Sequence, residues 1–200
     1  MSAADGLPWK EEDVGSSPTS LTMLNDLKWV RVIEPHRTIA RQFAHMQGLS
    51  MKHHGKDYDD WRNVQGMLGE VVLAQMLGCL KTWREHKVET LALDAAWDGG
   101  YDMAFNNVRI DCKTIAFRNP NKVADLHLYR GDHEGCDVYA AMLINEAELM
   151  REKDLHSIDW IDKVWCAGWI NRNSFTQRHM GRLRFPFKGL QRIDEMVLSR

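Results

Sequence analysis

The sequence lacks the features that mark membrane-spanning, secreted and disulfide-stabilised proteins. No stretch approaches the roughly 18–20 uninterrupted apolar residues that a membrane helix needs. The segment from Met1 to Ser20 has neither the basic start nor the apolar centre of a secretion signal. The four cysteines form no CxxC pair, and scattered thiols of this kind are typical of reduced proteins. We therefore expect a cytoplasmic protein without a membrane partner.

A surplus of positive charge is also missing. The formal net charge is −2 at pH 7, so no basic field surrounds the whole molecule, and any nucleic-acid binding must come from a local patch. The region from Arg172 to Arg192 offers such a patch, because it is basic and contains no acidic residue. An ordinary solvated surface is the alternative interpretation. The candidate phosphate-binding residues of this basic patch are Arg172, Arg178, Arg182, Arg184 and Lys188.

The length of 200 residues fits one domain with a short tail. Residues 1–22 are rich in Ser, Gly, Pro and acidic side chains and are predicted to be a flexible tail, and residues 23–200 are predicted to form a single domain. The hydrophobic periodicity indicates a mixture of helices and strands. The expected elements are a strand at 27–33, a helix from Pro35 with a connector between Gly48 and Gly55, a helix at 61–80, a hairpin at 101–115, strands at 136–144 and 164–170, and a short helix capped by Asn171 or Asn173.

The hairpin is the most informative element. Asn106 and Asn107 suit a two-residue turn, because Asn tolerates the positive φ values that such turns require. Phe105 then faces Val108, and the same register places Asp102 opposite Asp111. Side chains alternate between the two faces of a strand. One face therefore carries the core residues Tyr101, Met103, Phe105, Val108, Ile110 and Cys112, and the other carries Asp102, Ala104, Arg109, Asp111 and Lys113.

The charged face of this hairpin gathers side chains that suit a cation. Directly opposite residues have Cβ atoms about 4.5–5.5 Å apart, and like charges at that distance destabilise a sheet. A stable fold would pair Asp102 with Asp111 only with positive charge nearby. Lys113 supplies one charge, and Mg²⁺, which needs one or two protein carboxylates besides water, would supply more. A solvent-exposed face with a Lys–Asp ion pair is the alternative. Because Asp111 and Lys113 are predicted to face away from the core, we expect substitutions there to leave the fold intact.

A third carboxylate lies in an unusually apolar helix. Between Met67 and Leu80 the only polar residues are Glu70 and Gln75, and a helix this apolar on all sides is buried. A buried charge at Glu70 is costly unless it is paired or binds metal. Gly66 and Gly69 would let the helix backbone approach a sheet closely. We predict that Glu70 points toward the charged face of the hairpin, the alternative being a helix-edge Glu that reaches solvent or an Arg.

These residues together resemble the PD-(D/E)XK nuclease superfamily, which has the restriction-endonuclease-like fold. The matching pieces are Glu70 on the helix, Asp102 on the first hairpin strand, and Asp111, Cys112 and Lys113 on the second. Tyr101 stands where the motif has its proline. The resemblance covers roughly residues 60–175. It implies an α/β fold with a central mixed sheet that carries a catalytic β-hairpin and is flanked by helices.

The resemblance also implies a metal-dependent nuclease that hydrolyses phosphodiester bonds, with DNA as its partner. Asp102, Asp111 and the backbone carbonyl of Cys112 would hold Mg²⁺, for which Mn²⁺ can substitute. Glu70 would complete the site directly, through water, or by holding a second ion. Lys113 would orient the attacking water and stabilise the developing charge. The basic patch would bind phosphates. Strand preference, endo- or exonuclease action, a role in DNA processing, recombination or repair, a phage origin and homo-oligomer formation stay open.

Three other functions compete with this interpretation. The first is a catalytically silent nuclease-like domain that binds nucleic acid or a protein, although the complete set of acidic residues and Lys113 argues against it. The second is a zinc protein, but the available ligands fit no structural zinc spacing. The third is a cysteine-dependent hydrolase, which is disfavoured because Cys112 is predicted to lie in the core, where a thiol is inert. The ligands considered for zinc are His53, His54, His127, His133 and Cys136.

Overall fold

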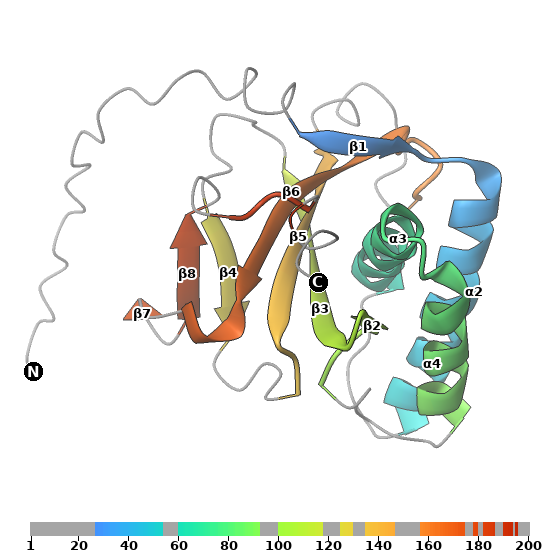
Figure 1. Cartoon of the computed structure of the whole chain (residues 1–200). Helices are drawn as coiled ribbons and strands as arrows, with labels where there is room; N and C mark the ends of the chain where they lie inside the picture. Colours follow the sequence, from blue (N-terminus) through green and yellow to red (C-terminus); the bar gives the residue numbers. More distant parts are fainter. Residues whose placement is uncertain are drawn as a thin grey trace, which may run out of the picture.

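A computed structural model gives the fold of most of the chain and shows an α/β protein (Figure 1). The predicted N-terminal tail at 1–22 lies outside the described residues. Among the residues that are described, no helix is both long and apolar enough to cross a membrane. The described residues are 27–53, 60–92, 100–117, 125–129, 135–146, 157–174, 178–179, 182–186, 190–193 and 195.

The centre of the fold is a five-stranded sheet with the strand order β1-β6-β5-β3-β2. Strands β3 and β5 are parallel, and the other three pairings are antiparallel, so the sheet is mixed as the sequence predicted. β5 lies at the middle and is buried along its length except at its last residue, which explains its continuous apolar sequence. The strands are β1 (Lys28–Arg31), β2 (Met103–Phe105), β3 (Val108–Phe117), β5 (Val138–Asn145) and β6 (Lys163–Asn171).

Helices cover one side of this sheet, and a second, smaller sheet lies on the other side (Figure 1). The small sheet has the order β4-β8-β7 and was not predicted. The predicted helix after β6 is a single 3-10 turn, η3 (Arg172–Ser174), in which the Asn171 side chain accepts a hydrogen bond from the backbone N–H of Asn173. The remaining elements are α2 (Glu34–His53), α3 (Asp60–Met76), α4 (Leu80–Ala92), β4 (Asp125–Tyr129), β7 (Arg178–His179) and β8 (Arg182–Pro186).

The helices differ from the prediction at their ends. A connector was expected from Gly48, but α2 continues through this buried glycine to His53. A glycine inside a helix costs about 1 kcal/mol relative to alanine, and burial of the preceding turn at Phe43 and Ala44 offsets that cost. α3 was predicted to run to Leu80 with Gly78 near its end, but it ends at Met76. Gly78 has a φ of 72° and donates to the Gln75 carbonyl, the hydrogen-bond pattern of a glycine C-cap.

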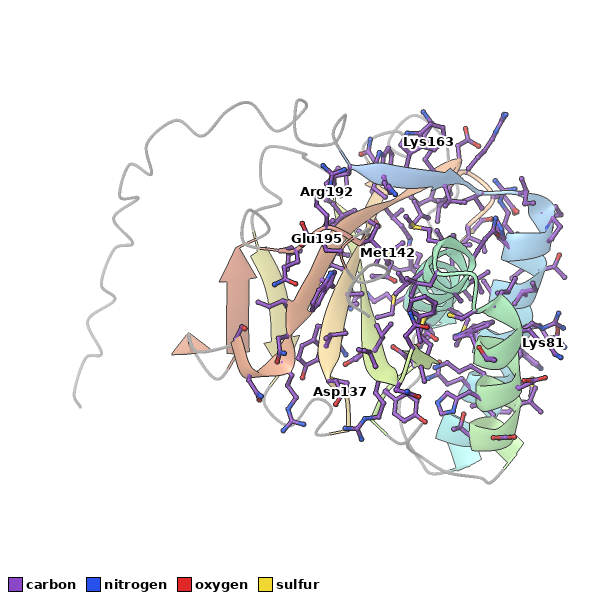
Figure 2. The ribbon with its side chains drawn as sticks, viewed as in Figure 1. Lys81, Asp137, Met142, Lys163, Arg192 and Glu195 are labelled. Atoms are coloured by element: carbon purple, nitrogen blue, oxygen red, sulfur yellow. The ribbon has the colours of Figure 1, made fainter. Side chains whose placement is uncertain are left out.

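Apolar side chains pack on both faces of the five-stranded sheet. The first cluster lies between the sheet and the helices, where Met142 is fully buried (Figure 2). The second cluster lies on the opposite face and includes Phe117, Tyr139 and Leu143. The hairpin strand β3 therefore contributes to a sheet that is covered on both faces, rather than one whose second face is open to solvent.

Candidate active site

The hairpin has the predicted turn and register. Asn106 and Asn107 have φ values of 50° and 64°, as a type I′ turn requires. Phe105 pairs with Val108 in an antiparallel ladder. Asp102 lies just before β2 and leaves this register, because its backbone N–H donates at 2.9 Å to the carbonyl of Ile110, the residue that pairs with Met103. The predicted pairing of Asp102 with Asp111 is therefore not part of the ladder, but the two carboxyl groups are near enough for the charge of Asp102 to raise the pKa of Asp111.

Helix α3 brings Glu70 to the hairpin through a close backbone contact. A Cβ atom added at Gly69 would lie 1.9 Å from the Thr114 hydroxyl oxygen on β3, so only glycine fits there. The Thr114 hydroxyl also donates to the Gly66 carbonyl at 3.2 Å. The predicted close approach of this helix to the sheet is confirmed. Glu70, the next residue along α3, is buried beside the start of the hairpin.

Glu70 and Asp102 both contact Lys87, which was not among the predicted site residues. The Lys87 ammonium nitrogen lies 2.9 Å from Glu70 Oε2 and 2.8 Å from Asp102 Oδ1, and the Lys87 side chain is 3% exposed. The Trp83 indole N–H, one turn earlier on α4, donates to the same Glu70 oxygen at 3.1 Å. The backbone N–H of Cys112 donates to Asp102 Oδ2 at 2.8 Å. Glu70 and Asp102 are thus held by four donated contacts inside the protein.

The two carboxyl groups respond differently to Lys87. Burial alone would raise the pKa of Asp102, but the Lys87 charge and the hydrogen bonds from Lys87 and Cys112 outweigh it and hold that pKa well below its usual range. For Glu70, burial dominates. Together with the nearby negative charge of Asp102, it raises the pKa of Glu70 to about 8 despite the attraction of Lys87. Without another cation, Asp102 is therefore the ionised member of this pair and Glu70 binds a proton more readily.

Asp111 is buried, which corrects the expectation that it faces away from the core. It pairs with Tyr139 in the parallel register of β3 and β5, so it lies on the face of the second apolar cluster and is 2% exposed. Burial raises the pKa of Asp111 well above its usual range, and the charge of Asp102 adds to the rise. Lys113 opposes it with an ammonium nitrogen 3.1 Å from Asp111 Oδ2. The Lys113 side chain is 23% exposed and lies nearest to solvent among these groups.

Asp102 links the predicted residues at one edge of the sheet, since it shares Lys87 with Glu70 and its charge acts on Asp111. Contrary to the prediction, Glu70 approaches from the face of β3 that carries Thr114, and not from the face of Asp111 and Lys113. β2 pairs with β3 only as far as Ile110, so that from Asp111 onward the described residues include no strand on this side of β3. Lys87 and Trp83 were missed because α4 itself was not predicted. A signal was present in the sequence. Trp83 and Leu91 mark the apolar stripe of a helix, and Lys87 lies midway between them on the same stripe.

The described part of the basic patch places one of its members at this end of the sheet. The backbone N–H of Arg172 donates to the carbonyl of Asp137, which lies at the sheet end labelled in Figure 2. The charges of Asp111 and Arg172 act on the pKa of Tyr139 in opposite directions. Lys188 lies outside the described residues, and the side chains of the remaining members of the patch, on β7 and β8, are not described: Arg178, Arg182 and Arg184.

The competing chemistries find little support in the described groups. Burial raises the pKa of the Cys112 thiol well above its usual range, and the neighbouring carboxylates add to this rise, so the thiolate that a cysteine hydrolase needs is disfavoured. Cys136, considered as a zinc ligand, is buried and has a pKa raised to about 11, chiefly by burial. Of the histidines considered with it, His54 and His133 lie outside the described residues, and the side chains of His53 and His127 are not described.

The donor set suits a hard divalent cation at two of the three carboxylates. Asp102 and Asp111 are adjacent oxygen donors that repel one another, and a cation would relieve that repulsion. Mg²⁺ is commonly held by one or two carboxylates and water. Glu70 is instead held by Lys87 and Trp83. In the described part of the chain, no three His, Cys, Asp or Glu side chains are grouped as possible ligands of one metal ion.

A scan against models of protein families, a search of curated protein sequences and a search of solved structures each found no match to this chain.

Proposed function

We propose that this chain is a metal-dependent deoxyribonuclease of the restriction-endonuclease-like type, with Mg²⁺ as its cation and Mn²⁺ as a substitute. The observation that carries the proposal is the chain of interactions that links Glu70, Asp102, Asp111 and Lys113, which come from α3 and the hairpin, at one edge of the sheet. Burying three carboxyl groups together is costly, and a fold that serves stability alone would avoid it. Metal-assisted hydrolysis gives this arrangement a purpose.

Asp102 and Asp111, with the backbone carbonyl of Cys112, would hold the cation. When bound there, Mg²⁺ would lower the pKa of a coordinated water and neutralise charge on the phosphate oxygens. Asp102 is prepared for this role, because Lys87 and the Cys112 N–H keep its carboxylate ionised and fixed in position. Asp111 would lose its proton as the cation binds, since its raised pKa reflects burial and the repulsion from Asp102.

Lys113 would act on the reacting groups. Its ammonium group is anchored to Asp111 at 3.1 Å and is partly exposed, so it can reach a phosphodiester that approaches the open edge of β3. Lys113 would orient the attacking water and stabilise the negative charge that grows in the transition state. Hydrolysis would proceed by in-line attack without a covalent enzyme intermediate. Arg172, at the same end of the sheet, would bind a neighbouring phosphate.

Cleavage of labelled linear and circular DNA tests this function. The wild-type chain would be compared with Lys113→Ala and Asp111→Asn in Mg²⁺, Mn²⁺ or EDTA. Asp111 is buried, so the asparagine variant preserves its volume. Lys163→Ala is the matched control, because Lys163 is exposed, stacks on Trp29 and lies at the opposite end of the sheet from Asp137 (Figure 2).

We expect cutting that requires a divalent ion, is lost in both site variants and persists in Lys163→Ala. Loss of one group that acts in the transition state typically lowers the rate by about 10²–10³-fold. The circular substrate then separates endonuclease from exonuclease action. If the folded wild-type chain cuts no DNA in either metal, the proposal is wrong, and retained DNA binding would then identify a silent binding domain.

A further inference from the structure

We propose that the Lys87 ammonium group is a resident cation between Glu70 and Asp102, so that the site takes a single divalent ion, at Asp102 and Asp111. The inference rests on the proposed function and narrows the role of Glu70 within it. Glu70 then holds Lys87 rather than a second metal ion. Lys87 is a positioning residue, because it acts on the reaction through the carboxylates that it fixes.

The first support is the position of the Lys87 nitrogen. It lies within 2.9 Å of one oxygen of each carboxylate, and all three side chains are 11% exposed or less. A metal ion that bridged Glu70 and Asp102 would have to take the place of this ammonium group. Moving Lys87 out would leave its charge in an apolar interior formed by α3, α4 and the sheet, where an unpaired ammonium is strongly disfavoured.

The second support is the set of donors around these carboxylates. Glu70 Oε2 accepts from both Lys87 and Trp83, and the two residues lie one turn apart on α4. Asp102 accepts from Lys87 at one oxygen and from the Cys112 N–H at the other. Helix α4 therefore places two hydrogen-bond donors, Lys87 and Trp83, on one face beside Glu70. Both donors bind the same oxygen of Glu70, so this carboxyl group is held as the acceptor of Lys87 and Trp83.

The third support is the charge of the cluster. Three carboxylates and two ammonium groups, those of Lys87 and Lys113, leave one negative charge in excess when all are ionised. One divalent ion changes the excess to a single positive charge, which matches one phosphodiester. A second divalent ion would leave three positive charges in a mostly buried site, and the desolvation of that charge would oppose binding. Lys87 thus limits the number of ions.

Counting bound Mn²⁺ on the metal-free protein tests the inference without relying on cleavage. The electron paramagnetic resonance signal of free Mn²⁺ would be followed during titration of the wild type, Lys87→Arg and Lys87→Met. We expect one ion per chain for the wild type and for the arginine variant, which keeps the charge, and a second ion for the methionine variant, which removes it. Lys81→Ala is the control on the same helix, because that side chain is 89% exposed and points away from the sheet (Figure 2).

A second variant keeps the test decisive if Lys87→Met does not fold. Glu70→Gln can still accept from Lys87 and Trp83 through its amide oxygen. If residue 70 lies outside the ligand shell, the Glu70→Gln protein should still bind one Mn²⁺ ion, with an affinity about 10- to 100-fold weaker than that of the wild type. Asp111→Asn, which alters a ligand, should abolish binding.

The outcomes separate this inference from the proposed function. Two ions on the wild type, a single ion on folded Lys87→Met, or loss of Mn²⁺ binding in Glu70→Gln would each overturn the role of Lys87 and leave a metal-dependent nuclease intact. No ion on the wild type would overturn the metal dependence and, with it, this inference. One ion on the wild type together with retained binding in Glu70→Gln supports it.

Discussion

Replacing Gly69 by alanine should destabilise the protein and displace Glu70. The new Cβ atom would lie 1.9 Å from the Thr114 hydroxyl oxygen, 3.1 Å from Thr114 Cβ and 3.2 Å from Thr114 Cγ2. Rotation of the Thr114 side chain would move the hydroxyl but break its hydrogen bond to the Gly66 carbonyl. Rotation would not move Thr114 Cβ, so α3 itself must shift away from β3.

The expected magnitude follows from two opposing effects. Alanine is a better helix former than glycine by about 1 kcal/mol. Overpacking of a core contact typically costs about 1–3 kcal/mol, and loss of the Thr114 hydrogen bond adds about 1 kcal/mol. The free energy of unfolding should therefore fall by about 1–3 kcal/mol. Because Glu70 follows directly in the helix, the same shift should lengthen its contacts with Lys87 and Trp83 and weaken Mn²⁺ binding.

Gly66→Ala is the matched control on the same helix. A Cβ atom added at Gly66 would meet nothing within 4 Å, so the substitution should raise stability by up to about 1 kcal/mol through helix propensity alone. Urea unfolding followed by circular dichroism would compare the two variants. Adding Thr114→Ala to Gly69→Ala should restore part of the loss, because it removes the 1.9 Å contact. Equal stability of the two single variants would refute the argument that Gly69 sets the distance between α3 and the sheet.

Two further predictions concern the buried carboxylate. Because the pKa of Glu70 is raised from 4.5 to about 8, its stabilising contribution is complete at low pH and is lost as the pH rises through that range. In metal-free protein the free energy of unfolding should then fall by up to about 1.4 kcal/mol per pH unit, and Glu70→Gln should flatten this slope, whereas an unchanged slope would contradict the assignment. Trp83→Phe keeps a ring beside Phe43 but removes the hydrogen bond to Glu70, so urea unfolding should show a loss of about 0.5–1.5 kcal/mol. The exposed Trp29→Phe should change stability by less than about 0.5 kcal/mol, and a comparable loss in both variants would contradict the role given to the indole N–H.

The hairpin was predictable because its information is local. The Asn106–Asn107 turn fixes the register, so the pairs from Phe105–Val108 to Met103–Ile110 follow from the sequence. The same reasoning placed Asp102 directly opposite Asp111, but the backbone leaves the ladder at Asp102. Gly69 was informative for a similar reason, since a glycine inside an apolar helix indicates close backbone packing. These features depend on residues within a few positions of one another, and no knowledge of the remaining fold was needed.

The burial of Asp111 was not predictable from the hairpin. Alternation along β3 separates apolar from charged residues, and the charged face then looks like a solvent face. The parallel neighbour β5, which begins more than 20 residues later, places Tyr139 beside Asp111 on a face where apolar side chains pack. The pairing is non-local, and only the tertiary structure reveals it. The consequence is practical, because a buried Asp111 calls for an asparagine variant where an exposed one would tolerate alanine.

Lys87 is a charged residue on the apolar stripe of its helix, and its buried position is explained by its contact with Glu70. From the sequence, Glu70 was expected to bind a metal ion or to reach solvent or an arginine. The partner is a lysine 17 positions later, on a helix that packs beside α3. Each charge explains the burial of the other, and Asp102 joins them because the hairpin begins at the same place. An uncompensated charge in this interior would be costly. Truncating Glu70, Asp102 or Lys87 to alanine should therefore lower the free energy of unfolding more than replacing the same residue with a neutral side chain of similar shape. The buried cluster is therefore both a condition of the fold and the frame on which the outer pair, Asp111 and Lys113, would act.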